Sequence, residues 1–247
     1  MPKSVRQQVL DLTTSVSPKR IENAQTALDR LMHPERGIGG LATELHVPHE
    51  LLFLYELAYG CWDDDRRSYG HIIQAGVHYG VTLCMLAQAA EKEVSPYLVY
   101  GIDPYQPQDD GDGYTYPHTE AYAGVRHTIS QLGLANRVCV CCFDSATFCE
   151  QLSVMFPVRL AFIDSNHTAA HVTREIRSIE PLVNPGGWLV FHDVFHTKLP
   201  EFSHVIERWI CDNEHRYDKW LRLRKYPEEG HEFSHIPMST VACRKKW

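Results

Sequence analysis

The sequence predicts an α/β domain over residues 63–247, built on a mostly parallel sheet with helices on both faces. From residue 71 onward, short continuous apolar runs alternate with longer amphipathic segments. This alternation is typical of strand–helix units in a parallel sheet that is covered on both sides. The length of 247 residues and the 44% hydrophobic content suit a chain that buries one full core.

Residues 1–62 are expected to form a helical segment ahead of this domain. Apolar residues recur at helical spacing over residues 20–33, behind a serine–proline start signal. A second helix is predicted over residues 47–60, between a proline near its start and a glycine at its end. We expect this segment to act as a lid over the functional site or as a contact in a homodimer.

The strands and helices of the domain follow in order along the chain. Five apolar runs are each followed by a helical segment, and two further strands close the chain. The predicted strands are 71–77, 97–103, 137–143, 158–164, 186–193, 217–226 and 236–246. The predicted helices after the first five strands are 81–93, 119–133, 145–156, 171–183 and 199–212.

Composition excludes several classes of partner and location. The net charge of −7 argues against nucleic acid or an anionic membrane as the main partner. There is no apolar stretch near the roughly 20 residues of a spanning helix, and the N-terminus has no secretory h-region. The eight cysteines lack the paired ligand spacing of a zinc site, so we expect reduced thiols and a cytoplasmic protein. The cysteine-rich run 137–143 is expected to be a buried strand.

Polar residues stand at the carboxyl end of each of the first five predicted strands. In open α/β sheets, ligands bind outside these ends. Any single aspartate there could instead be a helix N-cap, but the set as a whole favours a cofactor site. The strand-end residues are Gly76 and Gly80, Asp103, Asp144 with Ser145, Asp164, and His192 with Asp193.

The first two strand ends indicate the kind of cofactor. Gly76 and Gly80 bracket a turn that lets a ligand approach the backbone, and Asp103 can accept both hydroxyls of a ribose. Neither GxxxxGK[ST] nor GxGxxG occurs, so the turn does not fit a phosphate cradle. A nucleoside without phosphates fits better, which points to S-adenosylmethionine.

Three segments carry a resemblance to a known family: "IIQAGVHYGVTLCMLA", "VYGIDPY" and "FIDSNHTAAHVTREIRSIEPLVNPGGWLVFHDV". They resemble the class I S-adenosylmethionine-dependent methyltransferases, within them the small-molecule O-methyltransferase group that contains macrocin O-methyltransferase and the cephalosporin-hydroxylase-like proteins. The resemblance covers about residues 70–195. It implies a Rossmann-like sheet of seven strands whose last strand is antiparallel.

The resemblance also implies roles for the strand-end residues in holding the cofactor. The two glycines of the turn would line its methionine part, and the later acids would bind the ribose and flank the adenine. Where the family usually has an acid in the first strand, this chain has Gln74, whose amide can still accept from the cofactor's ammonium group. The predicted cofactor-binding residues are Gln74, Gly76, His78, Tyr79, Gly80, Asp103, Asp144, Ser145 and Asp164.

The same resemblance implies a divalent metal, usually magnesium, at Asp164 and Asp193. His192 stands where metal-binding relatives often have a second acid, and an imidazole suits zinc, manganese or iron better than magnesium. The predicted metal set is therefore Asp164, His192 and Asp193. His167 is a candidate general base or a helix-start contact, which makes the predicted catalytic set Asp164, His167 and His192. His171 is expected on the surface.

Together these expectations describe an O-methyltransferase that acts on a small hydroxylated metabolite, such as a sugar, a phenol or a polyketide, in natural product biosynthesis. The irregular loop 104–118 is expected to form a lid over the acceptor. Two alternatives stay open. One is a metal-dependent hydroxylase-like enzyme on the same fold, and the other is a cofactor-binding protein without catalysis.

Overall fold

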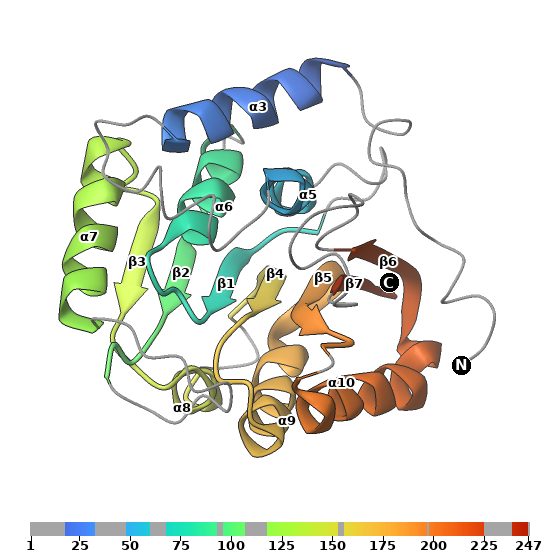
Figure 1. Ribbon diagram of the computed structural model, residues 1–247. Helices are drawn as coiled ribbons and strands as arrows, with labels where there is room; N and C mark the ends of the chain where they lie inside the picture. Colours follow the sequence, from blue (N-terminus) through green and yellow to red (C-terminus); the bar gives the residue numbers. More distant parts are fainter. Residues whose placement is uncertain are drawn as a thin grey trace.

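Continuous apolar strands form the middle layer of a three-layer molecule, with helices on both sides (Figure 1). Among the described residues, no helix combines the length and the apolar character that crossing a membrane requires. The computed structural model describes residues 18–32, 48–59, 68–92, 96–106, 118–152, 156–196, 198–224 and 239–246.

The sheet has seven strands in the order β3-β2-β1-β4-β5-β7-β6. The first five strands are mutually parallel, and β7 runs antiparallel to its neighbours β5 and β6. This confirms the predicted mostly parallel sheet with an antiparallel last strand. The strands are β1 His71–Ala75, β2 Val99–Ile102, β3 Val138–Cys141, β4 Val158–Ile163, β5 Val183–Val194, β6 Tyr217–Arg224 and β7 Ser239–Lys245.

Two helical layers cover the sheet. One contains α3, α5, α6 and α7, and the other contains α8, α9 and α10 (Figure 1). The helices are α3 Pro18–Met32, α5 Pro48–Ala58, α6 Val81–Lys92, α7 His118–Gln131, α8 Ser145–Glu150, α9 Ala169–Ile179 and α10 Pro200–Asn213, with short 3-10 turns η2 Glu180–Leu182 and η3 Glu214–Arg216.

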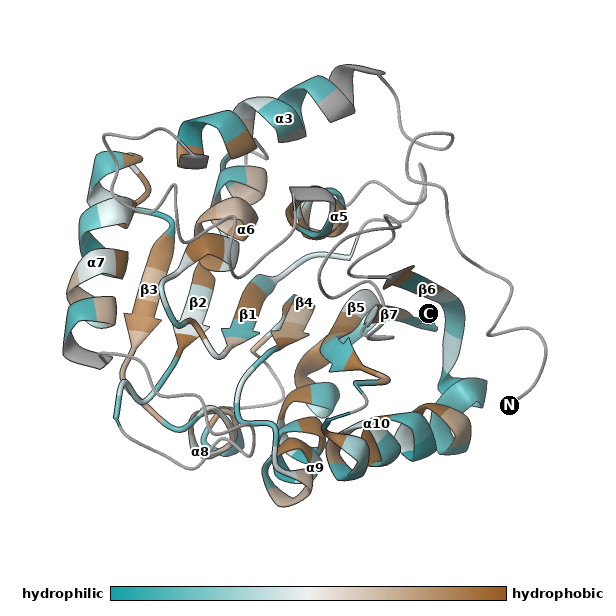
Figure 2. Cartoon of the chain, in the orientation of Figure 1, coloured by the Kyte–Doolittle hydropathy of each residue, from teal (hydrophilic) through white to brown (hydrophobic). Residues whose placement is uncertain are grey.

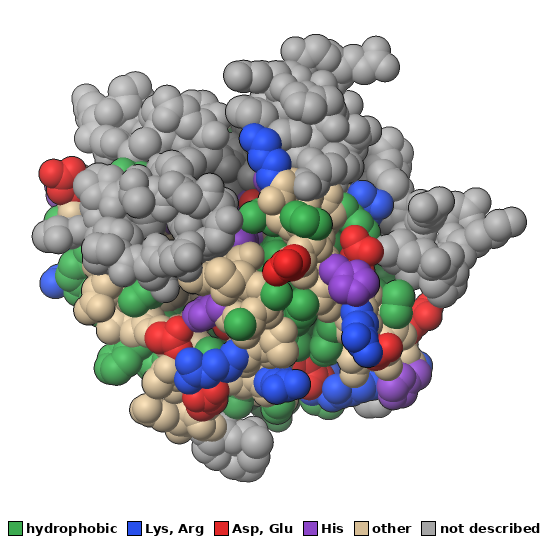
Figure 3. Space-filling model, turned by 60° about the horizontal axis from the view of Figure 1, so that its bottom comes forward, with side chains coloured by type: hydrophobic (Ala, Val, Ile, Leu, Met, Phe, Trp, Pro, Cys, Tyr) green, Lys and Arg blue, Asp and Glu red, His purple; other side chains and the backbone are tan. Residues whose placement is uncertain are grey.

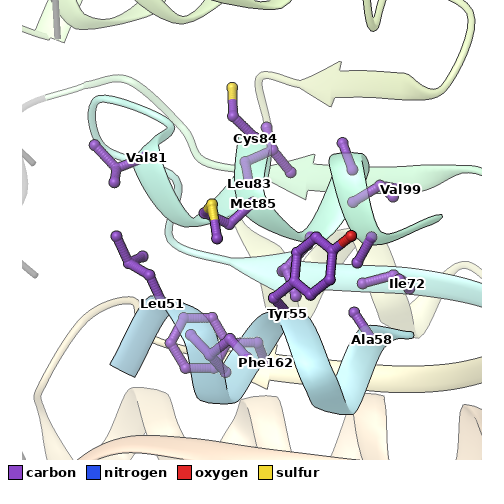
Figure 4. Packing of buried hydrophobic residues seen from close by; sticks show 14 of the residues in the cluster. Leu51, Tyr55, Ala58, Ile72, Val81, Leu83, Cys84, Met85, Val99 and Phe162 are labelled. Atoms are coloured by element: carbon purple, nitrogen blue, oxygen red, sulfur yellow. The ribbon is translucent and has the colours of Figure 1, made fainter. Parts of the chain in front are cut away.

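Each helical layer shares a hydrophobic core with one face of the sheet. Hydrophobic residues concentrate on the strands, while the outer sides of the helices carry hydrophilic residues (Figure 2). Figure 4 shows how α5 joins the first core: Leu51 and Tyr55 lie against Met85 of α6 and Phe162 of β4. All four side chains are at most 1% exposed. Helix α5 is therefore part of the core that supports the sheet.

Two predictions about local structure were wrong. The cysteine-rich strand β3 is half-buried, because it lies at the edge of the sheet and has a neighbour on one side only. The helix predicted over residues 145–156 ends at Glu150 as α8, because Gln151 and Leu152 form a tight turn. Strands β1, β2 and β3 also end two, one and two residues before the predicted ends, so their polar residues lie in the loops beyond them.

The closest backbone approach at the sheet edge joins the loops after β1 and β4. Gly76 has a left-handed φ of +80°, and a Cβ added there would lie 1.9 Å from the carbonyl oxygen of Asp164. The amide of Asp164 donates to the carbonyl of Ala75 at 2.9 Å. Only glycine fits this position, because any side chain would push the two strand ends apart.

We predict that Gly76→Ala lowers the free energy of unfolding by about 2–4 kcal/mol, since it adds both a steric overlap and a strained φ. Gly124→Ala is the matched control. A Cβ at Gly124 of α7 meets nothing within 4 Å, so this change is expected to stabilise the helix by about 0.5–1 kcal/mol. Urea denaturation of both variants measures the difference, and equal free energies would contradict the prediction.

Candidate active site

The polar strand ends gather at one edge of the sheet, where the strand order reverses between β1 and β4. Four non-glycine residues at this edge have a left-handed backbone: His78, Tyr105, Asp193 and Phe195, with φ between 48° and 67°. Such conformations cost free energy and cluster at functional sites. The pairing of β5 with β7 shifts between Phe191 and Val194, so Asp193 lies within this irregular part of the strand and Phe195 directly follows the strand.

Gln74 lies in β1 and is 2% exposed. Its Nε2 donates to the carbonyl of Gly76 at 2.8 Å, which fixes the side chain against the glycine turn. Its carbonyl oxygen Oε1 is buried and has no hydrogen-bond partner among the described residues. A buried acceptor without a partner is costly, and a ligand with an N–H group would satisfy it.

Asp103 follows β2 and is 4% exposed. Its Oδ2 accepts from the backbone amides of Val77 and His78, at 2.9 and 3.0 Å, and its Oδ1 accepts from the amide of Tyr105 at 2.8 Å. The carboxylate therefore holds the glycine turn in place, a role that the sequence interpretation did not foresee. Its predicted contact with a ribose stays a prediction.

Asp164, just after β4, converges with His192 and Asp193 in the last residues of β5. Nδ1 of His192 is 2.8 Å from Oδ1 of Asp164 and 3.3 Å from Oδ2 of Asp193. The imidazole side chain is 4% exposed, and its ring lies edge-on to Phe162 at 5.8 Å between centroids. The structure thus brings together Asp164 and the His192–Asp193 pair, which the sequence placed at two different strand ends.

Glu50 of α5 completes this group, and the sequence interpretation missed it. Its Oε1 is 3.1 Å from Nε2 of His192, and it also accepts from the hydroxyl of Thr240. The Glu50 side chain is fully buried. One signal could have revealed it: a carboxylate in the first turn of a helix whose other residues are nearly all apolar.

His167 lies beside the same carboxylates. Its Nε2 is 4.0 Å from Oδ1 of Asp164 and 3.9 Å from Oδ2 of Asp193, and its side chain is 12% exposed. The ring packs edge-on against Phe202 of α10, with 5.0 Å between centroids. The N-cap of α9 is Thr168, and His167 directly before it lies next to Asp164.

The metal set predicted from the resemblance does not fit this arrangement. Nε2 of His192 lies 3.1 Å from Glu50 and Nδ1 lies 2.8 Å from Asp164, so both ring nitrogens face carboxylate oxygens. Over the described residues, no group of three or more His, Cys, Asp or Glu side chains is arranged to hold a metal ion.

The predicted adenine contacts belong to a second cluster, formed by α8 and α9. Asp144 is the N-cap of α8, where it accepts from the amide of Thr147 at 2.8 Å and contacts Arg174 at 3.2 Å. Burial raises the pKa of Asp144, but the hydrogen bonds from Thr147 and the charge of Arg174 lower it overall. Acidic and basic side chains lie next to one another on this side of the molecule (Figure 3).

Glu175 of α9 connects the loops that follow β3 and β4. Its Oε1 accepts from the hydroxyls of Ser145 and of Ser165, the latter at 2.6 Å, and the Glu175 side chain is fully buried. The side chain of Ser145 is thus committed to a protein partner. A contact of Asp144 or Ser145 with the adenine stays a prediction.

The expectation that His171 lies on the surface was wrong. Its side chain is 17% exposed, with Nε2 3.3 Å from Glu175 and Nδ1 3.7 Å from Asp144. Burial lowers the pKa of His171, but the hydrogen bond and charge of Glu175 and the charge of Asp144 outweigh this and raise it above 6.5. The raised pKa favours the protonated, positively charged form of His171 between these two acids.

Tyr79 contacts His78 in the glycine turn, with 4.3 Å between ring centroids. Their predicted contact with the cofactor stays a prediction. Most of the loop 104–118, with its predicted lid role, lies outside the described residues.

In a comparison with known protein families, residues 73–194 match a family described as a methyltransferase domain. This range contains the predicted strand ends and leaves out Glu50. No curated protein shows a significant sequence match to the chain.

Solved structures with the same fold include several O-methyltransferases. The O-methyltransferase NovP has 13% sequence identity and a TM-score of 0.56, covering 82% of this chain and 83% of its own. The TDP-rhamnose 3'-O-methyltransferase of calicheamicin biosynthesis has 18% identity and a TM-score of 0.55, covering 95% and 99%. An O-methyltransferase from Bacillus cereus in complex with SAH has 16% identity and a TM-score of 0.54, covering 94% and 93%. At these identities, the likeness establishes the fold.

We predict that His171 makes stability depend on pH. Because its pKa is raised in the folded state, its stabilising effect is fully present below about pH 6.5 and is lost as the pH rises through the folded-state pKa. The free energy of unfolding of the wild type should therefore fall more steeply above pH 6.5 than that of His171→Gln. Urea denaturation between about pH 5.5 and pH 9 measures the free energy of unfolding of the wild type and of His171→Gln. The control is His204→Gln, at an exposed position of α10. Parallel curves for wild type and His171→Gln would contradict it.

Proposed function

We propose that this chain, which carries a class I S-adenosylmethionine-dependent methyltransferase domain, transfers a methyl group to a hydroxyl oxygen of a small metabolite. The observation that carries the proposal is the convergence of Asp164, His167, His192 and Asp193 at the switch point of the sheet. The proposed catalytic domain is residues 63–247, as the sequence indicates.

The proposed cofactor site uses the glycine turn and the polar ends of β1 and β2. S-adenosylmethionine, when bound, supplies a methyl group on a positively charged sulfur and carries an ammonium group. The buried Oε1 of Gln74 is an acceptor that fits this ammonium group. Asp103 fixes the turn through Val77 and His78, so the backbone that would surround the cofactor is already in position before binding.

The proposed chemistry of the site is removal of the acceptor's proton. A hydroxyl oxygen is a weak nucleophile while it keeps its proton, and a base within hydrogen-bonding reach contributes about 10²–10⁴-fold to such a step. Asp164 and His167 lie side by side with exposed fractions of 16% and 12%, so both can face an acceptor. Nδ1 of His192 lies 2.8 Å from Asp164 and 3.3 Å from Asp193, so a polar ring nitrogen stands beside both carboxylates and offsets their repulsion.

The proposed acceptor is a small hydroxylated compound such as a sugar or a phenol. The structural relatives include a TDP-rhamnose 3'-O-methyltransferase and an O-methyltransferase involved in tomaymycin synthesis. The net charge of −7 and the mixed charges in Figure 3 offer little to a polyanionic acceptor such as nucleic acid.

The hydroxylase alternative depends on His192 and Asp193 as metal ligands, and the contacts of His192 with carboxylates on both sides disfavour it. We predict that incubation with EDTA followed by gel filtration leaves methyl transfer unchanged. A rate that fell after this treatment and returned on addition of Mg²⁺, Mn²⁺ or Fe²⁺ would contradict the metal-free proposal.

For the cofactor site, we predict that Gln74→Ala weakens binding of S-adenosylhomocysteine by about tenfold or more, since it removes the acceptor for a charged donor. Binding of 5'-methylthioadenosine, which lacks the amino-acid part, should change much less. Isothermal titration calorimetry measures both affinities. Gln88→Ala, at a buried glutamine of α6 bonded to Ala27, is the matched control. Failure of the wild type to bind S-adenosylhomocysteine would refute the proposed function.

For the base, we predict that His167→Gln lowers the rate of methyl transfer by about 10²-fold and leaves the affinity for S-adenosylhomocysteine within about threefold of the wild type. The assay follows the labelled methyl group of S-adenosylmethionine onto a panel of catechols, flavonoids and nucleotide sugars. His204→Gln is the control. A His167→Gln variant with the wild-type rate would remove His167 from the mechanism.

A further inference from the structure

Helix α5 places a carboxylate at the back of the candidate site. Glu50 is fully buried, and its Oε1 contacts both the imidazole of His192 and the hydroxyl of Thr240. Glu50 lies outside residues 73–194, the part of the chain that matches the methyltransferase-domain family. The candidate site therefore includes a residue from the N-terminal helical segment.

The ring of His192 is held from two opposite sides. Nε2 faces Glu50 at 3.1 Å, and Nδ1 faces Asp164 at 2.8 Å and Asp193 at 3.3 Å. An imidazole has its two nitrogens on opposite sides of the ring, so contacts at both nitrogens fix its rotation about the Cβ–Cγ bond. Rotation of the ring would break both contacts at once.

The position of Glu50 is also rigid. Its neighbours Leu51, Phe53 and Leu54 are at most 2% exposed and pack into the core shared with α6 and the sheet. Thr240 lies in β7, the strand that pairs with β5, and its hydroxyl donates to the same carboxylate oxygen of Glu50. A buried carboxylate on an apolar helix costs stability unless it is paired. Here its partners are the imidazole of His192 and the hydroxyl of Thr240.

We propose that Glu50 is a positioning residue, which fixes the ring of His192 so that its Nδ1 stays directed at Asp164 and Asp193. The inference rests on the proposed function in one respect, because it takes Asp164, the carboxylate beside His192, to be part of the group that removes the acceptor's proton. The N-terminal segment then supports the catalytic group directly. Its predicted role as a lid or a homodimer contact stays a separate prediction.

The test observes the ring of His192 by NMR in protein labelled with ¹⁵N-histidine. A ring that is 4% exposed and held by acceptors on both sides should give a downfield, slowly exchanging imidazole N–H signal. His192→Gln assigns this signal by its disappearance. Glu50→Ala should abolish it, and Glu50→Gln, which has nearly the same shape, should shift it. Glu50→Gln decides the question if Glu50→Ala does not fold.

Glu56→Gln is the matched control. Glu56 is also buried, at 4% exposure, on the same helix, and six residues place it roughly 120° around the helix from Glu50. This variant should leave the His192 signal in place. A signal that is missing in the wild type, that is unchanged in Glu50→Gln, or that moves equally in Glu56→Gln would overturn the proposal.

Calorimetry with S-adenosylhomocysteine on the same samples separates this inference from the proposed function. If the wild type does not bind this ligand, the proposed function fails, while a shift of the His192 signal in Glu50→Gln still supports the positioning role. If Glu50→Gln shifts the signal and binds S-adenosylhomocysteine with the wild-type affinity, Glu50 acts on the ring of His192 and leaves the cofactor site unchanged. A loss of affinity beyond about tenfold in Glu50→Gln would overturn the proposal, since Glu50 would then shape the cofactor pocket.

Discussion

The contact between the ends of β1 and β4 is the constraint on which the rest of the site depends. Gly76 has no side chain, so the carbonyl of Asp164 can pack against its Cα, and the amide of Asp164 bonds to Ala75. This brings Gln74 and Asp164, from strands more than 80 residues apart in the sequence, to the same edge.

The carboxylates at this edge would repel one another without a positive or donating group among them. In this chain the imidazole of His192 occupies that place, with Glu50 on one side and Asp164 and Asp193 on the other. The low exposure of all four side chains strengthens each contact, because little water screens it. A second group of the same kind, with His171 between Asp144 and Glu175, holds α8 and α9 together.

Most of the fold could be predicted from the sequence, because continuous apolar strands and amphipathic helices leave a periodic pattern. The meeting of Asp164 and Asp193 followed from the same reasoning, since the carboxyl ends of parallel strands share an edge. The half-exposure of β3 could not be predicted, because edge position depends on strand order. The sequence marks Glu50 only as a carboxylate on a nearly all-apolar helix. Its contact with His192, like the contacts of Glu175, depends on tertiary packing and could not be predicted. Asp103 was assigned to a ligand, and its bonds to the turn amides became visible only in three dimensions.

The contact of Glu50 with His192 has a consequence for building hybrid enzymes from this chain. A crossover placed between α5 and β1 would look harmless, since it leaves the family-matched range 73–194 intact. A donor segment without a carboxylate at the Glu50 position would nevertheless leave Nε2 of His192 without its carboxylate neighbour. When the N-terminal segment is exchanged for that of a distant relative, the residue at the Glu50 position should therefore decide the choice of relative, ahead of overall sequence similarity. The same choice can be used deliberately, to exchange acceptor-binding parts while the proton-handling group stays intact.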